Sequence, residues 1–446
     1  MAFGQTQPLS ALGELCASIL LTTLPQDTPW LHRADLAALL AALGPGQARY
    51  VGGAVRDTLL GLDVKDIDLA TPLEPREVMR RLKAHSISVV PTGIDHGTVT
   101  AIIVGSPVEI TTLRHDVSTD GRRATVAFAS TWQDDAARRD FTINALYADP
   151  VSGEIWDYFG GLDDLAARRV RFIGDARQRI REDHLRILRY FRFQARFGSQ
   201  PADDDSEEAC AELAATLKGL SRERVGMEMI NLLGLPDPAP TVARMAELGV
   251  LAQVLPEADV AGLAALVAEE ARQAVAPDAV RRLAALLPPD VALAEHVAAR
   301  FRLSGAQKKR LALAAGRNAE SPPLGEVASQ SDDGGGLSDK KSPPPSVARA
   351  PATSPSGGDS QAARALAYRL GLTAALDRLL LTGQNIAPLA GWEIPTFPLK
   401  GGQIVALGVK AGPEVARVLK AVETRWVEEG FPDGERVASL LDEALA

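Results

Sequence analysis

The chain has 446 residues, with 48 Lys or Arg against 57 Asp or Glu, which gives a formal net charge of −9 at pH 7. One hydrophobic core stops growing near roughly 250 to 300 residues, so we expect several domains. Hydrophobic residues make up 46% and charged residues 24%, and this ordinary composition excludes global disorder, collagen and a bundle of membrane helices. An acidic chain that binds a polyanion must do so through a local basic patch.

The two cysteines, Cys16 and Cys210, lie far apart and outside any CxxC pair. They predict neither a disulfide framework nor a cysteine zinc site, and they favour a cytoplasmic location. No Lys or Arg precedes the apolar run at residues 15–24, so we predict a buried helix there instead of a secretory signal. No stretch approaches the roughly 20 apolar residues of a membrane span, so no membrane partner is expected.

The first third of the chain alternates short β-branched runs with helical stretches. Charged and apolar residues at helical spacing predict a helix at residues 75–85. After about Leu165 the strand pattern stops, and apolar residues at i, i+3 and i+4 predict helices to the end. The expected fold class is therefore α+β, a mixed β-sheet followed by an all-α remainder. Strands are predicted at residues 49–51, 67–70, 87–90, 99–104 and 108–113.

Residues 321–360 differ from their surroundings because they are crowded with Pro, Gly, Ser and Asp. Such a segment buries too little apolar surface to order itself, so we predict a disordered insert. Helical spacing resumes at residues 362–380, which indicates that the insert interrupts a helical domain.

Gly52 and Gly53 follow the first predicted strand and open a helical stretch, with Arg56 close behind. Free backbone amides at a helix start can bind an anion such as a triphosphate, and Arg56 adds a cation. A tight turn that simply needs glycine is the alternative interpretation.

Asp66 and Asp68 stand at i and i+2 on the next predicted strand, so both carboxylates point to one face. Their repulsion is relieved by divalent cations, and oxygen ligands favour Mg²⁺. Glu109 on a later strand is the candidate third acid if the sheet order places it beside Asp68. Two-metal nucleotidyl transfer is the hypothesis, and a solvated edge strand is the alternative.

The motif around Arg138, Arg139 and Asp140 combines two guanidinium groups with an acid. One arginine is expected to bind phosphate while Asp140 orients the other, because bidentate Arg–phosphate pairing is strong and directional. Surface ion pairs at a helix end are the alternative.

Residues 179–192 form the most informative stretch, within a segment, Arg168 to Arg196, that carries ten Arg and three acidic residues. On one helix, Glu182, Asp183, Arg186 and Arg189 would share a side. A carboxylate there could accept from the exocyclic amine of C or A while an arginine donates to the ring acceptors. Intrahelical salt bridges are the alternative.

Taken together, these motifs resemble the family of class II tRNA nucleotidyltransferases and bacterial poly(A) polymerases. GGAVRD with DIDLAT, RRDFTINAL, DYFGGLDDL and REDHLRILRYFRF stand in that family's order between Tyr50 and about Leu233, and RERVGME looks like its fifth motif. The resemblance implies a nucleotidyltransferase head, a neck, and a helical body and tail that hold the acceptor end of tRNA. By position it implies metal on Asp66 and Asp68, nucleotide contacts from Gly53, Arg56 and Arg139, and base selection by Glu182, Asp183 and Arg186 beside Arg189.

The domain organisation expected from this resemblance follows the motifs. The head, with an N-terminal helical lead-in, spans residues 1–150, the neck with its nucleotide-selecting helix 151–233, the body 234–320, the insert 321–360, and the rest of the body and tail 361–446.

Three functions stay open. The first is a CCA-adding enzyme that uses CTP and ATP on tRNA ends, and the second is a poly(A) polymerase or an enzyme adding only CC or only A. The third is a catalytically silent RNA-binding protein. The acidic end, with Asp442 and Glu443, favours tRNA, and the intact Asp66 and Asp68 argue against silence. Expected partners are the tRNA acceptor end, ATP and CTP, with no obligate protein partner.

Overall fold

The computed structural model describes residues 22–104, 106–120, 123–128, 131–318 and 357–446. Its contacts divide the chain into two compact units, Met1–Leu220 with Glu247–Val254, and Ser221–Ala246 with Leu255–Ala446. The buried helix predicted at 15–24 lies mostly outside the described residues. Its last residues are not helical, because Thr23 bridges Glu154 and the Leu24 N–H donates to the Gly153 carbonyl at 2.8 Å.

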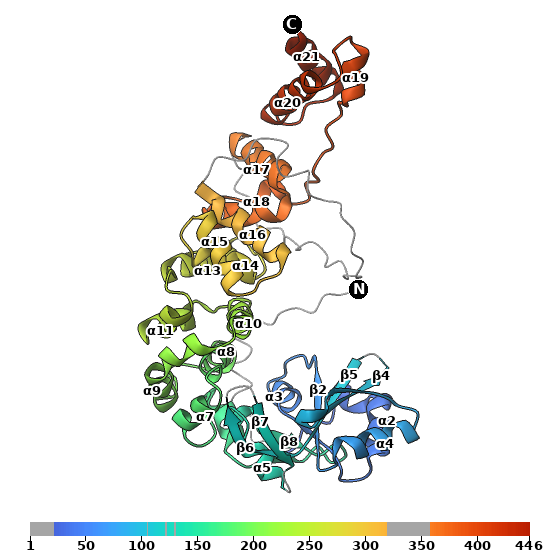
Figure 1. Ribbon diagram of the computed structural model, residues 1–446, viewed down its shortest axis with the longest axis vertical. Coiled ribbons are helices and arrows are strands. Elements are labelled where there is room, and N and C mark those ends of the chain that lie inside the picture. The colour runs from blue at the N-terminus through green and yellow to red at the C-terminus, as the bar shows by residue number, and fades with distance from the viewer. Residues whose placement is uncertain (1–21, 105, 121–122, 129–130, 319–356) are drawn as a thin grey trace. The chain divides into compact units, whose positions relative to one another are not determined.

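A mixed seven-stranded sheet organises the first unit, in the order β3-β4-β5-β2-β1-β8-β9 (Figure 1). Only β2 and β5 pair in parallel. The five predicted strands are all present, so the α+β prediction is confirmed, while the four strands from β6 to β9 were missed. The strands are β1 (Arg49–Val51), β2 (Ile67–Thr71), β3 (Ser88–Gly93), β4 (Thr98–Ile103), β5 (Ser106–Thr112), β8 (Leu146–Ala148), β9 (Ile155–Asp157) and the separate hairpin β6 (Arg114–Asp120) and β7 (Arg123–Phe128).

One face of this sheet is covered by helices. α2 (Ala34–Leu43) and α4 (Pro75–Ala84) lie side by side and pack on β4, while α3 (Gly53–Leu59) packs on β1, β2 and β8 (Figure 1). Ile67 and Leu69 of β2 are buried, and burying such a side chain contributes about 1.5–3 kcal/mol before entropy is counted. Because side chains alternate along a strand, this burial turns Asp68 to the other face.

The segment Asp157–Leu165 lies within the first unit and leads into α6 (Gly161–Ala166). The Asp157 carboxylate accepts from the backbone N–H groups of Gly161 and Leu162, both at 2.9 Å. A Cβ on Gly161 would lie 2.3 Å from the Thr142 carbonyl oxygen, so only glycine fits this contact.

After α6, all elements of the described residues are helical, as predicted. Residues 357–360, the end of the predicted insert, are helical because α17 begins at Gly357; the other residues of that insert lie outside the described ones. No described helix has both the length and the apolar composition of a membrane span. In the first unit these helices are α7 (Ala176–Glu182), α8 (Arg186–Phe197), α9 (Asp204–Glu212) and α12 (Leu251–Val254); the others are α10 (Arg222–Leu233), α11 (Ala239–Glu247), α13 (Val260–Arg272), α14 (Ala279–Ala285), α15 (Val291–Arg300), α16 (Gly305–Ala315), α17 (Gly357–Leu370), α18 (Leu372–Leu381), α19 (Gly401–Ala406), α20 (Pro413–Glu428) and α21 (Gly434–Leu445).

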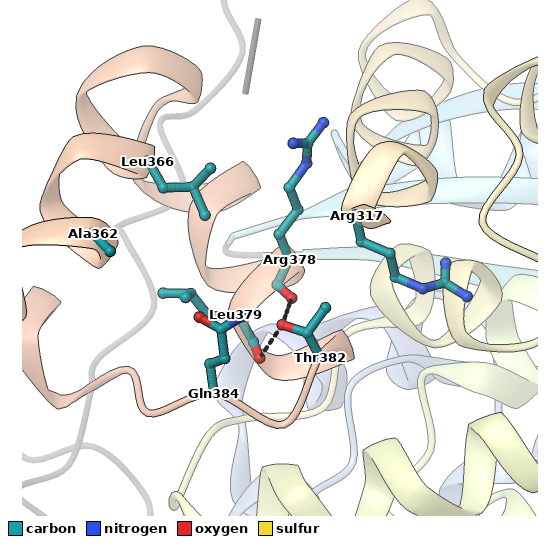
Figure 2. Close-up of a pocket in the computed structure, with 7 residues that line it drawn as sticks. All are labelled: Arg317, Ala362, Leu366, Arg378, Leu379, Thr382 and Gln384. Carbon is teal, nitrogen blue, oxygen red and sulfur yellow. Dashed lines mark hydrogen bonds between the residues drawn. The ribbon is translucent and has the colours of Figure 1, made fainter. Parts of the chain in front are cut away.

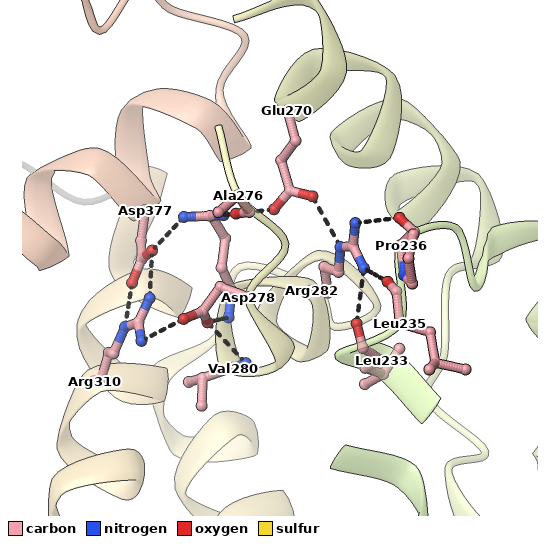
Figure 3. A network of polar contacts seen from close by, with 11 residues as sticks. Leu233, Leu235, Pro236, Glu270, Ala276, Asp278, Val280, Arg282, Arg310 and Asp377 are labelled. Carbon is pink, nitrogen blue, oxygen red and sulfur yellow. Dashed lines mark hydrogen bonds and ion pairs between the residues drawn. The ribbon is translucent and has the colours of Figure 1, made fainter. Parts of the chain in front are cut away.

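A buried ion network connects the helices of the second unit (Figure 3). Arg282, only 1% exposed, donates to Glu270 at 2.8 Å and to the backbone carbonyls that follow α10, among them Pro236 at 2.8 Å. Arg281 bonds the other oxygen of Glu270, at 2.7 Å. Every charge in this group therefore has a partner of opposite sign, which is the condition for tolerating charge in a core.

Candidate active site

Asp66 and Asp68 flank the first residue of β2, so Asp66 lies just before the strand and is exposed, whereas Asp68 is half-buried. In the parallel pairing of β2 with β5, Asp68 lies directly opposite Glu109. The sheet order therefore places Glu109 beside Asp68, which was the condition for Glu109 to be the third acid. Glu109 and Asp66 are both close enough for their charges to act on Asp68.

The pKa of Asp68 reflects its burial and these neighbouring charges. Its pKa is raised to about 6, chiefly by burial and also by the charges of Glu109 and Asp66, while the charge of Arg139 acts in the opposite direction. Negative charges held this close favour a bound cation.

Carboxylate oxygens such as those of Asp66, Asp68 and Glu109 are the ligands that hard divalent metals prefer. Within the described part of the chain, no group of three or more His, Cys, Asp or Glu side chains is arranged so that it could hold a metal ion. Mg²⁺ in nucleotide enzymes is usually held by one or two carboxylates, and it completes its shell with waters and substrate phosphates. Asp66 and Asp68 fit a metal of that kind, with Glu109 beside them.

The glycine turn lies on the other side of Asp68. β1 ends at Val51, Gly52 has φ 68°, and α3 begins at Gly53, as the sequence predicted. The Arg139 Nη1 lies 3.5 Å from where a Cβ on Gly52 would be. The charge of Arg139 also acts on Asp68, so this guanidinium is near both the turn and that carboxylate. The turn, Arg139 and Asp68 are therefore neighbours, and they make up the candidate site.

Asp135 orients the paired arginines, a role the sequence assigned to Asp140. It is 1% exposed and accepts from Arg138 at 2.9 Å, from Arg139 at 3.2 Å and from the Tyr147 hydroxyl at 2.6 Å. Burial raises its pKa, but the charges of Arg139 and Arg138 together with the hydrogen bonds from Tyr147 and Arg138 lower it overall. Spacing of i+3 and i+4 along α5 (Trp132–Ala137) and its end could have identified this residue.

Asp140 has a different set of partners. Its Oδ1 accepts from the Phe141 N–H and the Asn144 amide, both at 2.9 Å, and its Oδ2 accepts from Arg189. Burial raises the pKa of Asp140, but the charge of Arg189 and the hydrogen bonds from Asn144 and Arg189 hold it at about 2. The carboxylate and Arg189 are therefore engaged with each other.

Arg56, expected to face the nucleotide, is 6% exposed and directed inward. Its guanidinium pairs with Asp57 at 2.7 Å, bonds Asn144 and lies 4.1 Å from the ring centroid of Phe197 in α8. Burial lowers its pKa, although Asp57 opposes that effect. The residue joins α3 to α8 by a cation–π contact.

The predicted base-selecting helix is two helices. α7 ends at Glu182 and α8 begins at Arg186, and between them the Asp183 carboxylate accepts from the Leu185 N–H at 3.1 Å. That local bond competes with helix continuation. Ile187, Leu188 and Phe191 form the buried face of α8.

Arg186 stabilises this junction. It donates to Glu182 at 2.6 Å, to the Arg179 carbonyl at 2.9 Å and to the Arg138 carbonyl at 3.2 Å. Glu182 also pairs with Arg179 at 2.7 Å. The salt-bridge alternative thus describes Glu182 and Arg186. The bond from Arg186 to the Arg138 carbonyl also connects the α7–α8 junction to the motif around Arg138, Arg139 and Asp140.

A cavity of about 210 Å³ lies in the second unit, lined by residues that include Arg317, Leu366 and Arg378. Figure 2 shows the Arg317 guanidinium pointing away from Leu366, and it donates to the carbonyls of Ala284 and Leu287. None of the predicted site residues lines this cavity.

Two segments of the chain match known protein families. Residues 48–171 match the family described as "Poly A polymerase head domain", and residues 203–261 match "Probable RNA and SrmB- binding site of polymerase A". Among curated proteins, "CCA tRNA nucleotidyltransferase 1, mitochondrial" of Danio rerio is 34% identical over 400 residues, which cover 86% of this chain and 84% of that protein. The human protein of the same name is 47% identical over 190 residues, which cover 42% of this chain and only 44% of its own length.

Solved structures agree with this match. The Bacillus stearothermophilus CCA-adding enzyme in complex with CTP is 25% identical, with a TM-score of 0.64 over 92% of this chain and 96% of that one. The Thermotoga maritima CCA-adding enzyme complexed with tRNA shares the fold, with a TM-score of 0.62 at 18% identity over 97% of this chain and 98% of that one.

Proposed function

This chain belongs to the CCA tRNA nucleotidyltransferase family, and from that membership we propose that it adds C, C and A to the 3′ end of tRNA from CTP and ATP. The proposal rests on the pairing of Asp68 with Glu109, next to Arg139 and the Gly52 turn. The acids can hold a metal ion. Arg139 and the backbone amides at the start of α3 can bind a triphosphate.

The proposed reaction transfers a nucleotidyl group from the nucleoside triphosphate to the tRNA. The 3′-hydroxyl oxygen of the tRNA forms a bond to the α-phosphorus of the nucleotide, the bond from that phosphorus to the bridging oxygen breaks, and pyrophosphate leaves. The hydroxyl proton goes to a base, for which Glu109 is our candidate. Arg139 and the amides after Gly52 hold the triphosphate in line.

Asp66 and Asp68 would hold a divalent ion, and we propose Mg²⁺. Such an ion stabilises charge on the transferred phosphate and on the leaving pyrophosphate. The chain's own contribution is to hold the two carboxylates on β2 and to keep Arg139 fixed through Asp135.

We propose that Asp183 and Arg186 select the base, with Glu182 and Arg189 in support. Asp183 would accept the amine that C and A share, and Arg186 would donate to the neighbouring ring acceptors. In the described state Arg186 already donates to Glu182 and to two carbonyls, so base selection requires it to exchange one of those bonds for the nucleotide.

A poly(A) polymerase, or an enzyme that adds only CC or only A, would use the same head. One assay separates these functions: tRNA ending at the discriminator base is incubated with each labelled nucleotide alone and with all four together, and product ends are sequenced. We expect C-C-A ends. A homopolymeric A tail, ends that stop at CC, or binding without extension would each contradict the proposal.

Localisation stays a proposal as well. The two cysteines favour a cytoplasmic location, and Cys210 is a buried free thiol. The human and zebrafish relatives carry "mitochondrial" in their names, so imaging of a tagged full-length protein is the test.

A further inference from the structure

A row of paired residues crosses the sheet from the proposed metal ligands to its edge. Asp68 pairs with Glu109, Glu109 pairs with Thr100, and Thr100 pairs with Val90, across β2, β5, β4 and β3. Residues paired directly across strands point to the same face. Glu109 is exposed and Val90 is 45% exposed, so the row lies on the open face.

The edge strand is irregular where it meets this row. The register between β3 and β4 shifts between Val90 and Gly93. Within that irregularity, the Thr92 hydroxyl lies 2.7 Å from the Thr100 hydroxyl. Bulges re-aim side chains and concentrate near active sites. Thr100 is buried and Thr92 is exposed, so Thr92 is the member of the pair that a ligand can reach.

The two sides of Asp68 carry different chemistry. On the β1 side lie the Gly52 turn and Arg139, which suit the triphosphate. On the β5 side lie Glu109 and the threonine pair. In-line displacement puts the attacking and leaving oxygens on opposite sides of the phosphorus. The acceptor hydroxyl therefore approaches from the β5 side.

We propose that Thr92, held by Thr100, binds the 2′-hydroxyl of the terminal ribose of the RNA acceptor. Strands lie about 4.8 Å apart, so the threonine pair begins about 10 Å from Asp68, which leaves room for one ribose above Glu109. The 2′-hydroxyl both donates and accepts hydrogen bonds, as a threonine hydroxyl does. Val90 and Ile102, 45% and 48% exposed, offer apolar contact for the sugar.

This inference rests on the proposed function, and its test compares two acceptors. One is tRNA ending at the discriminator nucleotide, and the other differs only by a 2′-deoxyribose at that terminal nucleotide. The measured quantity is kcat/KM for the first CTP addition. Wild type should prefer the ribose end by roughly 3- to 10-fold, the size of one hydrogen bond. Thr92→Val should extend both acceptors at the wild-type rate for the deoxy end, with KM for CTP unchanged.

Two further variants control the comparison. Thr92→Ser keeps the hydroxyl and should keep the preference. Thr98→Val removes a hydroxyl from the other threonine pair on β4 and β5, Thr98 with Thr111 at 3.2 Å, which lies beside Ala70 and not beside Asp68. It should also keep the preference.

The outcomes separate the two proposals. Thr92→Val with an undiminished preference, or wild type without one, overturns the assignment of Thr92 and leaves CCA addition intact. Wild type that extends neither acceptor overturns the proposed function, and the role of Thr92 with it.

Discussion

Arg189 of α8 binds Asp140 through a single carboxylate oxygen: its Nε and Nη2 lie 3.0 and 2.5 Å from Oδ2. The other oxygen, Oδ1, is occupied by Phe141 and Asn144. The pair joins the loop after α5 to α8, which begins at Arg186. In this arrangement both oxygens of Asp140 accept hydrogen bonds, from Phe141, Asn144 and Arg189.

The first prediction concerns the pH dependence that follows from this pair. The pKa of Asp140 falls from 3.8 to about 2 on folding. A carboxyl whose pKa is lower in the folded state stabilises the protein above its unfolded pKa, and that stability is lost as pH falls through the folded pKa. Asp140→Asn should therefore remove about 2 kcal/mol at pH 7 and flatten the decline in unfolding free energy between about pH 4 and 2. Urea unfolding across that range measures it.

The control for this prediction is Asp95→Asn, which changes an exposed carboxylate. It should leave the pH profile unchanged. Parallel profiles for wild type and Asp140→Asn would show that Arg189 does not stabilise the charged carboxylate.

The second prediction concerns the metal. Asp66→Asn and Asp68→Asn should each lower nucleotide incorporation by at least roughly 100-fold while tRNA binding persists, because metal charge stabilisation is worth several kcal/mol. A chelator should stop the wild-type enzyme and added Mg²⁺ should restore it. Asp63→Asn, an exposed acid in the loop before β2, is the matched control and should remain active. Near-normal turnover of Asp68→Asn would exclude the metal assignment.

The third prediction separates base selection from scaffolding. Arg186→Ala removes bonds to Glu182 and to two carbonyls, so the unfolding free energy should fall by about 2–3 kcal/mol. If Arg186 also contacts the base, the preference for CTP and ATP over UTP and GTP should fall about tenfold. Competition assays with all four nucleotides measure this ratio.

Two comparisons complete that experiment. Asp183→Ala should change the nucleotide preference in the same direction as Arg186→Ala. Arg181→Ala, an exposed arginine of α7, should change neither stability nor preference. An equal loss for all four nucleotides in Arg186→Ala would assign the residue to the α7–α8 junction alone.

The fourth prediction concerns the ion network of Figure 3. Arg282→Met leaves Glu270 with one arginine and leaves the carbonyls after α10 without their donor. Breaking a buried pair from one side costs about 3–5 kcal/mol. Calorimetry should show this loss for Arg282→Met and almost none for Arg417→Met, whose pair with Glu414 is exposed. Equal unfolding temperatures for the two variants would rule out a stabilising network.

Local sequence determined the elements and the chemistry they carry. The β-branched runs predicted β1 to β5 because strand propensity and alternation act between near neighbours in the chain. The same holds for the glycine turn, for Asp66 and Asp68 about the start of β2, and for the buried stripe of α8. The strands β8 and β9 have three residues each, too few for an alternation to be visible.

Tertiary structure decided which of these residues meet. Glu109 became a neighbour of Asp68 only through the parallel pairing of β2 with β5, and no local pattern fixes the partner of a strand. Arg56 turned inward because Phe197, far along the chain, offers its ring. Helical spacing cannot show that the chain breaks at Asp183, because the Leu185 amide and the contacts of Arg186 with distant carbonyls outweigh helix continuation there. The residue types follow from short-range preferences, whereas their distances depend on packing between segments remote in sequence.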